Sequence, residues 1–159
     1  MLDEATDGSS LPYFSSEHEI LRAQIRRFVE TEIKPYAQAW EDQGFVPREV
    51  LRRMGELGFF GIRYPQQYGG SEMDVLASVV LAEELGRSTF GGVAITVLVH
   101  TDMASVHIYN SGVQAIKDRF MPDIISGRKI VAVAVTEPDA GSDVKTFERG
   151  RDATAMNTF

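Results

Sequence analysis

The stretch that decides the fold class is Gly92-Val93-Ala94-Ile95-Thr96-Val97-Leu98-Val99-His100-Thr101-Asp102-Met103-Ala104-Ser105-Val106-His107-Ile108-Tyr109-Asn110. A helix through these residues is apolar on almost every side, and such a helix is normally central and surrounded by others. Its most apolar window, Phe90–Met103, is shorter than the roughly 20 residues of a membrane-spanning helix, and it contains His100 and Asp102. We therefore expect a buried core helix and no membrane span.

Further helices are predicted on both sides of this segment. The capping-box spacing of Ser16-Glu17-His18-Glu19 places a helix start near Glu17, and Pro35 ends or kinks that helix. Asp74 is expected to cap a helix to about Leu85, with Val75 and Val79 turned inward. Shorter helices are predicted at residues 36–43, 48–57, 113–121 and 122–126, and an ordered loop with aromatic anchors Phe59, Phe60, Tyr64 and Tyr68 at residues 59–70.

The pattern changes after residue 128. Lys129–Thr136 is short and rich in β-branched residues, which predicts a strand, and Glu137–Asp143 has turn chemistry. The expected fold class is an all-α helical domain over residues 11–128, followed by the start of a β-domain over 129–144. Residues 1–10 are predicted to be a disordered tail and residues 145–159 an irregular tail.

Composition excludes several function classes. The 159 residues include no cysteine, which removes disulfides, thiolate catalysis and Cys-ligated zinc. A net charge of −7 argues against a nucleic-acid partner. Residues 1–10 lack the features of a secretory or mitochondrial targeting segment, so a cytoplasmic location is expected. His100 and His107 are seven residues apart on one helical face, but two histidines without a third ligand are a weak metal signal.

Two kinds of polar group could do chemistry. At the end of the predicted strand, Gly141 and Ser142 could hold a phosphate, a pyrophosphate or a ring carbonyl, although an ordinary turn has the same composition. Glu83 and Glu84 are adjacent, so they point about 100° apart on a helix, and a solvated or capping role is expected. Asp102 on an apolar helix requires a partner, and Arg22 and Arg63 are the candidates.

Four separated motifs carry a family resemblance. Ala134-Val135-Thr136-Glu137-Pro138-Asp139-Ala140-Gly141-Ser142-Asp143 resembles the Thr-Glu-Pro-x-Ala-Gly-Ser-Asp signature of acyl-CoA dehydrogenases. Upstream, Tyr64–Gly70 is similar to the family's Pro-x-x-x-Gly-Gly loop, and Ala82–Arg87 to the end of its middle helix. The stretch from Gly112 through Lys117 and Pro122 to Gly127 also matches, so the resemblance covers residues 11 to about 146.

The resemblance implies an FAD-dependent enzyme that oxidises acyl-CoA to 2-enoyl-CoA in fatty-acid or branched-acid β-oxidation. It further implies an electron-transfer flavoprotein as acceptor, a homo-oligomer at full length, and a glutamate base that comes from a C-terminal helical domain, outside these residues. By match, Val133, Val135 and Thr136 would line the flavin, with Thr136 donating to its polar edge. Gly141 and Ser142 would contact the FAD phosphates, and Ser142 would also reach the CoA arm. Residues 92–110 and the Tyr64 loop would help to wall the acyl pocket.

The sequence also departs from the family pattern. Val133 and Asp139 differ from the residues usual there, and the hairpin expected after Asp143 is not recognisable. We therefore expect a fragment, inactive alone, with a frameshift or premature stop near Lys145. The alternatives are a non-catalytic helical binding domain and a flavin oxidase or monooxygenase of the same superfamily.

Overall fold

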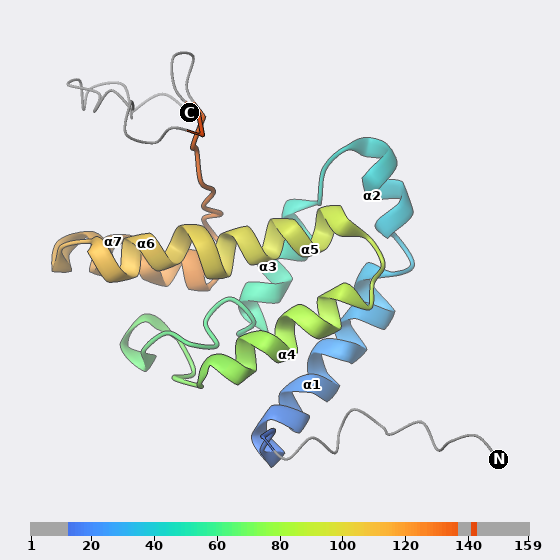
Figure 1. Cartoon of the computed structure of the whole chain (residues 1–159), viewed down its shortest axis with the longest axis horizontal. Coiled ribbons are helices and arrows are strands. Elements are labelled where there is room, and N and C mark those ends of the chain that lie inside the picture. Colours follow the sequence, from blue (N-terminus) through green and yellow to red (C-terminus); the bar gives the residue numbers. More distant parts are fainter. Residues whose placement is uncertain (1–12, 137–140, 143–159) are drawn as a thin grey trace.

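The computed structural model describes residues 13–136 and 141–142, and this part of the chain is helical (Figure 1). The elements are α1 (Ser16–Phe28), the π-helical η2 (Val29–Ile33), α2 (Ala37–Gln43), α3 (Arg48–Glu56), the 3-10 helical η3 (Gln66–Tyr68), α4 (Val75–Gly86), α5 (Gly91–Leu98), the π-helical η4 (Val99–Ala104), α6 (Ser105–Ser111) and α7 (Gln114–Ile125). The predicted all-α domain is confirmed.

A hydrogen-bonded cap defines the start of α1 and joins it to α4. The N-cap is Ser15 and not Ser16, since the Ser15 hydroxyl accepts from the His18 backbone N–H and His18 Nδ1 accepts from the Ser15 N–H. Histidine therefore takes the place that glutamate has in the usual capping box. His18 Nε2 also lies 2.8 Å from Oδ1 of Asp74, the N-cap of α4, so one imidazole joins the starts of two helices.

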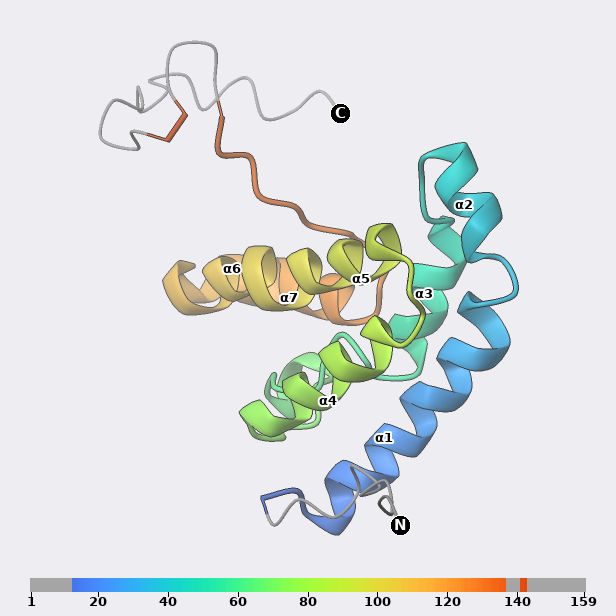
Figure 2. The same ribbon diagram turned by 45° about the vertical axis from the view of Figure 1, so that its right-hand side comes forward.

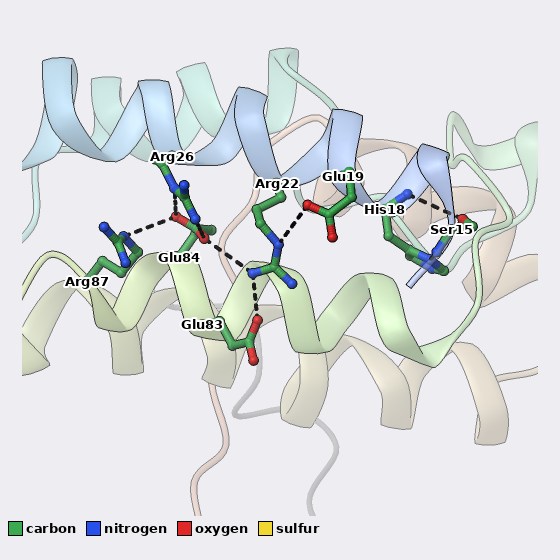
Figure 3. Close-up of polar contacts among 8 residues, drawn as sticks. All are labelled: Ser15, His18, Glu19, Arg22, Arg26, Glu83, Glu84 and Arg87. Carbon is green, nitrogen blue, oxygen red and sulfur yellow. Dashed lines mark hydrogen bonds and ion pairs between the residues drawn. The ribbon is translucent and has the colours of Figure 1, made fainter. Parts of the chain in front are cut away.

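An ion-pair network holds α1 against α4 (Figure 3). The Glu84 side chain is 1% exposed and accepts hydrogen bonds from Arg26 at 2.9 and 3.0 Å and from Arg22 at 3.3 Å, with Arg87 3.4 Å away. Glu83, which is half exposed, accepts from Arg22 at 2.6 Å. The expectation of a solvated or capping Glu84 is wrong, because Arg22 and Arg26 lie one turn apart on the face of α1 that meets α4.

The rotation of α4 also differs from the prediction. Val75 and Val79 are 59% and 40% exposed, whereas the buried face consists of Ala77, Val80, Leu81, Glu84 and Leu85. A helix that is apolar on most sides does not reveal its inward face by periodicity. In the orientation that α4 adopts, Glu84 lies on the buried face and pairs with Arg22 of α1.

The helix that decides the fold class runs unbroken from Gly91 to Ser111 through α5, η4 and α6. It packs on α4 and α7, but Ile95 and Met103 are 56% and 48% exposed, so the expectation of a helix surrounded on all sides is wrong within the described residues. With 21 residues it is long and apolar enough to cross a membrane by length and composition. The apolar segment is therefore longer than the window Phe90–Met103 from which the sequence argument excluded a membrane span. Core helices of soluble proteins can have the same length and composition.

The chain leaves the helices after α7. Pro122 lies inside α7, so residues 114–125 form one helix where two were predicted. Ile130 and Val131 pack on the helical core, and residues 132–136 are exposed. The predicted strand at Lys129–Thr136 is not formed, because a strand requires a hydrogen-bonded neighbour and residues 13–136 with 141–142 provide none. The expected domain boundaries stay predictions, and the tails predicted at residues 1–10 and 145–159 lie outside the described residues.

Candidate functional site

A cavity of about 90 Å³ lies between the loop after α3 and the long helix. Residues 59, 60 and 62–64 form one side, Ser78 and Leu81 of α4 a second side, and residues 101, 102, 106, 109 and 110 the third. Phe59, Phe60 and Tyr64 are buried, as the sequence predicted for the aromatic anchors of this loop. The walls are therefore mostly apolar and come from three separate segments of the chain.

Tyr64 fixes the loop to the long helix. Its hydroxyl lies 2.7 Å from Ser105 Oγ and donates to the carbonyl of Thr101 at 3.2 Å. Burial raises the pKa of Tyr64, so the phenol stays protonated at neutral pH. Tyr64 therefore positions the wall of the cavity and does not act as a base there.

The polar wall of the cavity is an aspartate with two partners. Asp102 lies 3.7 Å from Arg63 and accepts a hydrogen bond from Thr101 Oγ1 at 2.6 Å. Of the two predicted partners of Asp102, Arg63 is confirmed, whereas Arg22 binds Glu83 and Glu84. The cavity therefore has apolar walls on most sides and a charged wall at Asp102 and Arg63.

The five predicted cofactor-binding residues lie on the segment that leads away from the helices (Figure 2). Val133 and Val135 are 36% and 49% exposed, Thr136 and Ser142 are exposed, and Gly141 is half-buried. A Cβ placed on Gly141 would lie 3.8 Å from Thr136 Cγ2, so the structure brings these two positions together. None of the five lines the cavity, and their roles toward a flavin stay predictions.

The sequence model of the acyl-CoA dehydrogenase N-terminal domain matches residues 15–128, most of the chain. This chain belongs to the acyl-CoA dehydrogenase family. It is 37% identical over 132 residues to the mitochondrial long-chain specific acyl-CoA dehydrogenase of Rattus norvegicus. The aligned region covers 83% of this chain and 30% of that relative.

Solved structures of acyl-CoA dehydrogenases share the fold. The enzyme from Geobacillus kaustophilus superposes with a TM-score of 0.79 at 36% identity, over 85% of this chain and 35% of that one. The Bacillus anthracis acyl-CoA dehydrogenase complexed with FAD gives a TM-score of 0.77 at 34% identity, over 84% and 23%. The chain thus spans about a third or less of the length of these acyl-CoA dehydrogenases.

Two histidines of this acyl-CoA dehydrogenase chain differ from their predicted arrangement. His100 is 1% exposed, whereas His107 is exposed, because the wider π turn of η4 shifts the helical register between them. No group of three or more potential metal ligands occurs among the described residues. The contacts of His100 and Ser105 were not predicted, since a polar residue on an apolar helix does not reveal its partner.

Proposed function

We propose that this chain supplies the N-terminal helical domain and the first flavin-contacting segment of an FAD-dependent acyl-CoA dehydrogenase, which oxidises acyl-CoA to 2-enoyl-CoA. The observation that carries the proposal is the family match over residues 15–128, directly followed by exposed signature residues. The proposal covers the substrate class and leaves acyl chain length open.

The exposed segment fits one wall of a flavin site. Val133 and Val135 present apolar surface of the kind that packs on an aromatic ring, and the hydroxyls of Thr136 and Ser142 are accessible. Hydride acceptance is the chemistry that bound FAD supplies. In this proposal Thr136 donates a hydrogen bond to the polar edge of the ring, and Gly141 and Ser142 contact the phosphates.

In this proposal the cavity holds the acyl part of the substrate, and the catalytic base comes from another part of the family fold. The pocket formed by the Tyr64 loop and residues 101–110 orients the acyl part of the substrate and excludes water from it. The glutamate base belongs to the part of the family fold that follows these residues. We therefore propose that the 159 residues alone have no dehydrogenase activity.

A chimera tests the proposal. Residues 11–144 would replace the matching segment of the Geobacillus kaustophilus enzyme. We expect a yellow protein whose flavin absorbance is bleached anaerobically by an acyl-CoA and restored by an electron-transfer flavoprotein. A folded but colourless chimera would favour the non-catalytic binding domain. Reoxidation by oxygen alone would favour the oxidase or monooxygenase.

A matched pair of threonine variants tests the predicted contact. Loss of a hydroxyl that bonds the cofactor costs about 1 kcal/mol, so Thr136→Ala should weaken FAD binding by the chimera about fivefold. Thr31→Ala is the control, because Thr31 is exposed on η2 and donates only to the carbonyl of Arg27. Equal dissociation constants for FAD in both variants would contradict the role of Thr136.

Oligomeric state, the role of the long helix and cellular location remain proposals. A homo-oligomer at full length is what the family resemblance implies, and size-exclusion chromatography of the chimera would measure it. We propose that Gly91–Ser111 serves as a domain helix and not as a membrane span, and that the protein is cytoplasmic. Cell fractionation tests both, since a spanning helix would place the chain in the membrane pellet.

A further inference from the structure

The imidazole of His100 is buried at the point where three segments meet. It belongs to η4, its side chain is 1% exposed, and its ring meets that of Phe60 edge-on with centroids 4.5 Å apart. Nε2 lies 3.1 Å from the carbonyl oxygen of Ile124, in the last turn of α7. Nδ1 lies 3.1 Å from the backbone nitrogen of Val131, which donates to it.

These two contacts define the state of the ring. The partner of Nδ1 is an N–H group, so Nδ1 must be the acceptor, and the partner of Nε2 is a carbonyl, so Nε2 must carry the proton. The neutral imidazole with a proton on Nε2 satisfies both bonds at once. His100 therefore connects α7 with the segment that follows it through a single side chain.

Val131 is the last residue before the exposed part of the segment. Ile130 and Val131 are half-buried against the helices, whereas residues 132–136 are exposed. Thr136 lies five residues after Val131, within about 18 Å of it even for a fully extended chain. The hydrogen bond to His100 thus holds the chain two residues before Val133, the first of the five predicted flavin-contacting residues.

We propose that His100 is a positioning residue that fixes the starting point and direction of the flavin-contacting segment by accepting the Val131 N–H. This rests on the proposed function, because only a bound flavin gives that direction a chemical consequence. The π-helical turn η4 takes part in both sites. It presents His100 to Val131, and it presents Thr101 and Asp102 to the cavity. π turns within α-helices occur frequently at functional sites.

Two amide variants separate the two bonds of His100. In His100→Asn the side-chain amide reaches the position of Nδ1 and can still accept from Val131, while the bond to Ile124 is lost. In His100→Gln the longer side chain reaches the position of Nε2 and can still donate to Ile124, while the bond to Val131 is lost. Val131→Pro removes the same donor from the other partner and leaves His100 in place.

The first readout is hydrogen exchange of the Val131 amide in the 159-residue chain. We expect exchange about tenfold faster in His100→Gln than in the unchanged protein, and close to the unchanged rate in His100→Asn. Helical circular dichroism confirms that each variant is folded. Equal protection of Val131 in both variants would overturn the anchoring role, whatever the outcome with flavin.

The second readout is the dissociation constant of FAD from the chimera. His100→Gln and Val131→Pro should weaken binding about tenfold, and His100→Asn by much less. If exchange at Val131 responds but FAD affinity is equal in all variants, the positioning role is overturned while the proposed function stands. If the unchanged chimera itself binds no flavin, the proposed function fails, and the exchange result still reports on the anchor.

Discussion

At the scale of single residues, the Glu84 carboxylate is the group on which the pairing of α1 with α4 depends most. It is 1% exposed and faces the guanidinium groups of Arg22, Arg26 and Arg87. Burial alone would raise the pKa of Glu84, but the hydrogen bond and charge of Arg26, followed by Arg22 and Arg87, outweigh burial and hold that pKa below its usual value. The carboxylate is therefore ionised in the folded protein at neutral pH.

Removal of this carboxylate takes away the hydrogen bonds that it accepts from Arg26 and from the buried Arg22, although Arg22 keeps Glu83 as a partner. We predict that Glu84→Ala lowers the free energy of unfolding by about 1.5–3 kcal/mol, the range for lost hydrogen bonds to a charged group, measured by urea denaturation at neutral pH. Glu83→Ala is the matched control, since Glu83 is half exposed and its pair with Arg22 contributes about 1 kcal/mol or less. Similar losses in the two variants would show that burial of Glu84 does not determine the strength of the pairing.

At the scale of elements, glycine-to-alanine changes at two helix positions distinguish the cost of tight packing from the effect of restricting the backbone of the unfolded chain. A Cβ on Gly55 of α3 would lie 2.3 Å from the backbone carbon of Ser126, directly after α7, whereas a Cβ on Gly86 of α4 would meet nothing within 4 Å. Gly55→Ala should therefore lower the free energy of unfolding by about 1–3 kcal/mol or more, because backbone must move. Gly86→Ala should raise it by about 0.4–1 kcal/mol by restricting the unfolded chain. A stable Gly55→Ala protein would mean that α3 and α7 can separate without cost.

The elements also show where sequence reasoning succeeds and fails. Helix existence was predictable, because Pro35 and Asp74 carry local helix-end signals that do not depend on the tertiary structure. Helix orientation was not, because Val75 and Val79 are as apolar as the residues that are buried. In the candidate site, burial of the aromatic loop followed from residue type, whereas residue type left Arg22 and Arg63 as alternative partners of Asp102, of which the structure shows Arg63. The contact between His100 and Val131 was not predictable, since it joins residues 31 apart and uses a backbone N–H, which every residue except proline has.

At the scale of the whole molecule, the buried titratable groups predict how stability depends on pH. Burial lowers the pKa of His100, although its hydrogen bond to the carbonyl of Ile124 acts in the opposite direction. The unfolded chain therefore binds a proton at His100 more readily than the folded protein does. The stability that depends on neutral His100 is fully present above the unfolded-state pKa of about 6.5 and is lost as pH falls below it toward the folded-state pKa.

Glu84 contributes with the same sign in a lower window. Its lowered pKa supplies stability that is present above the unfolded-state value of about 4.3 and is lost as pH falls through the folded-state pKa. We predict that urea midpoints decline first below about pH 6.5 and then more steeply below about pH 4.3. His100→Asn should remove the first decline only, because asparagine does not titrate. A midpoint for the unchanged protein that stays level across the upper window would mean that His100 accepts a proton without losing its contacts to α7 and Val131. A decline that survives in His100→Asn would mean that another titrating group causes it.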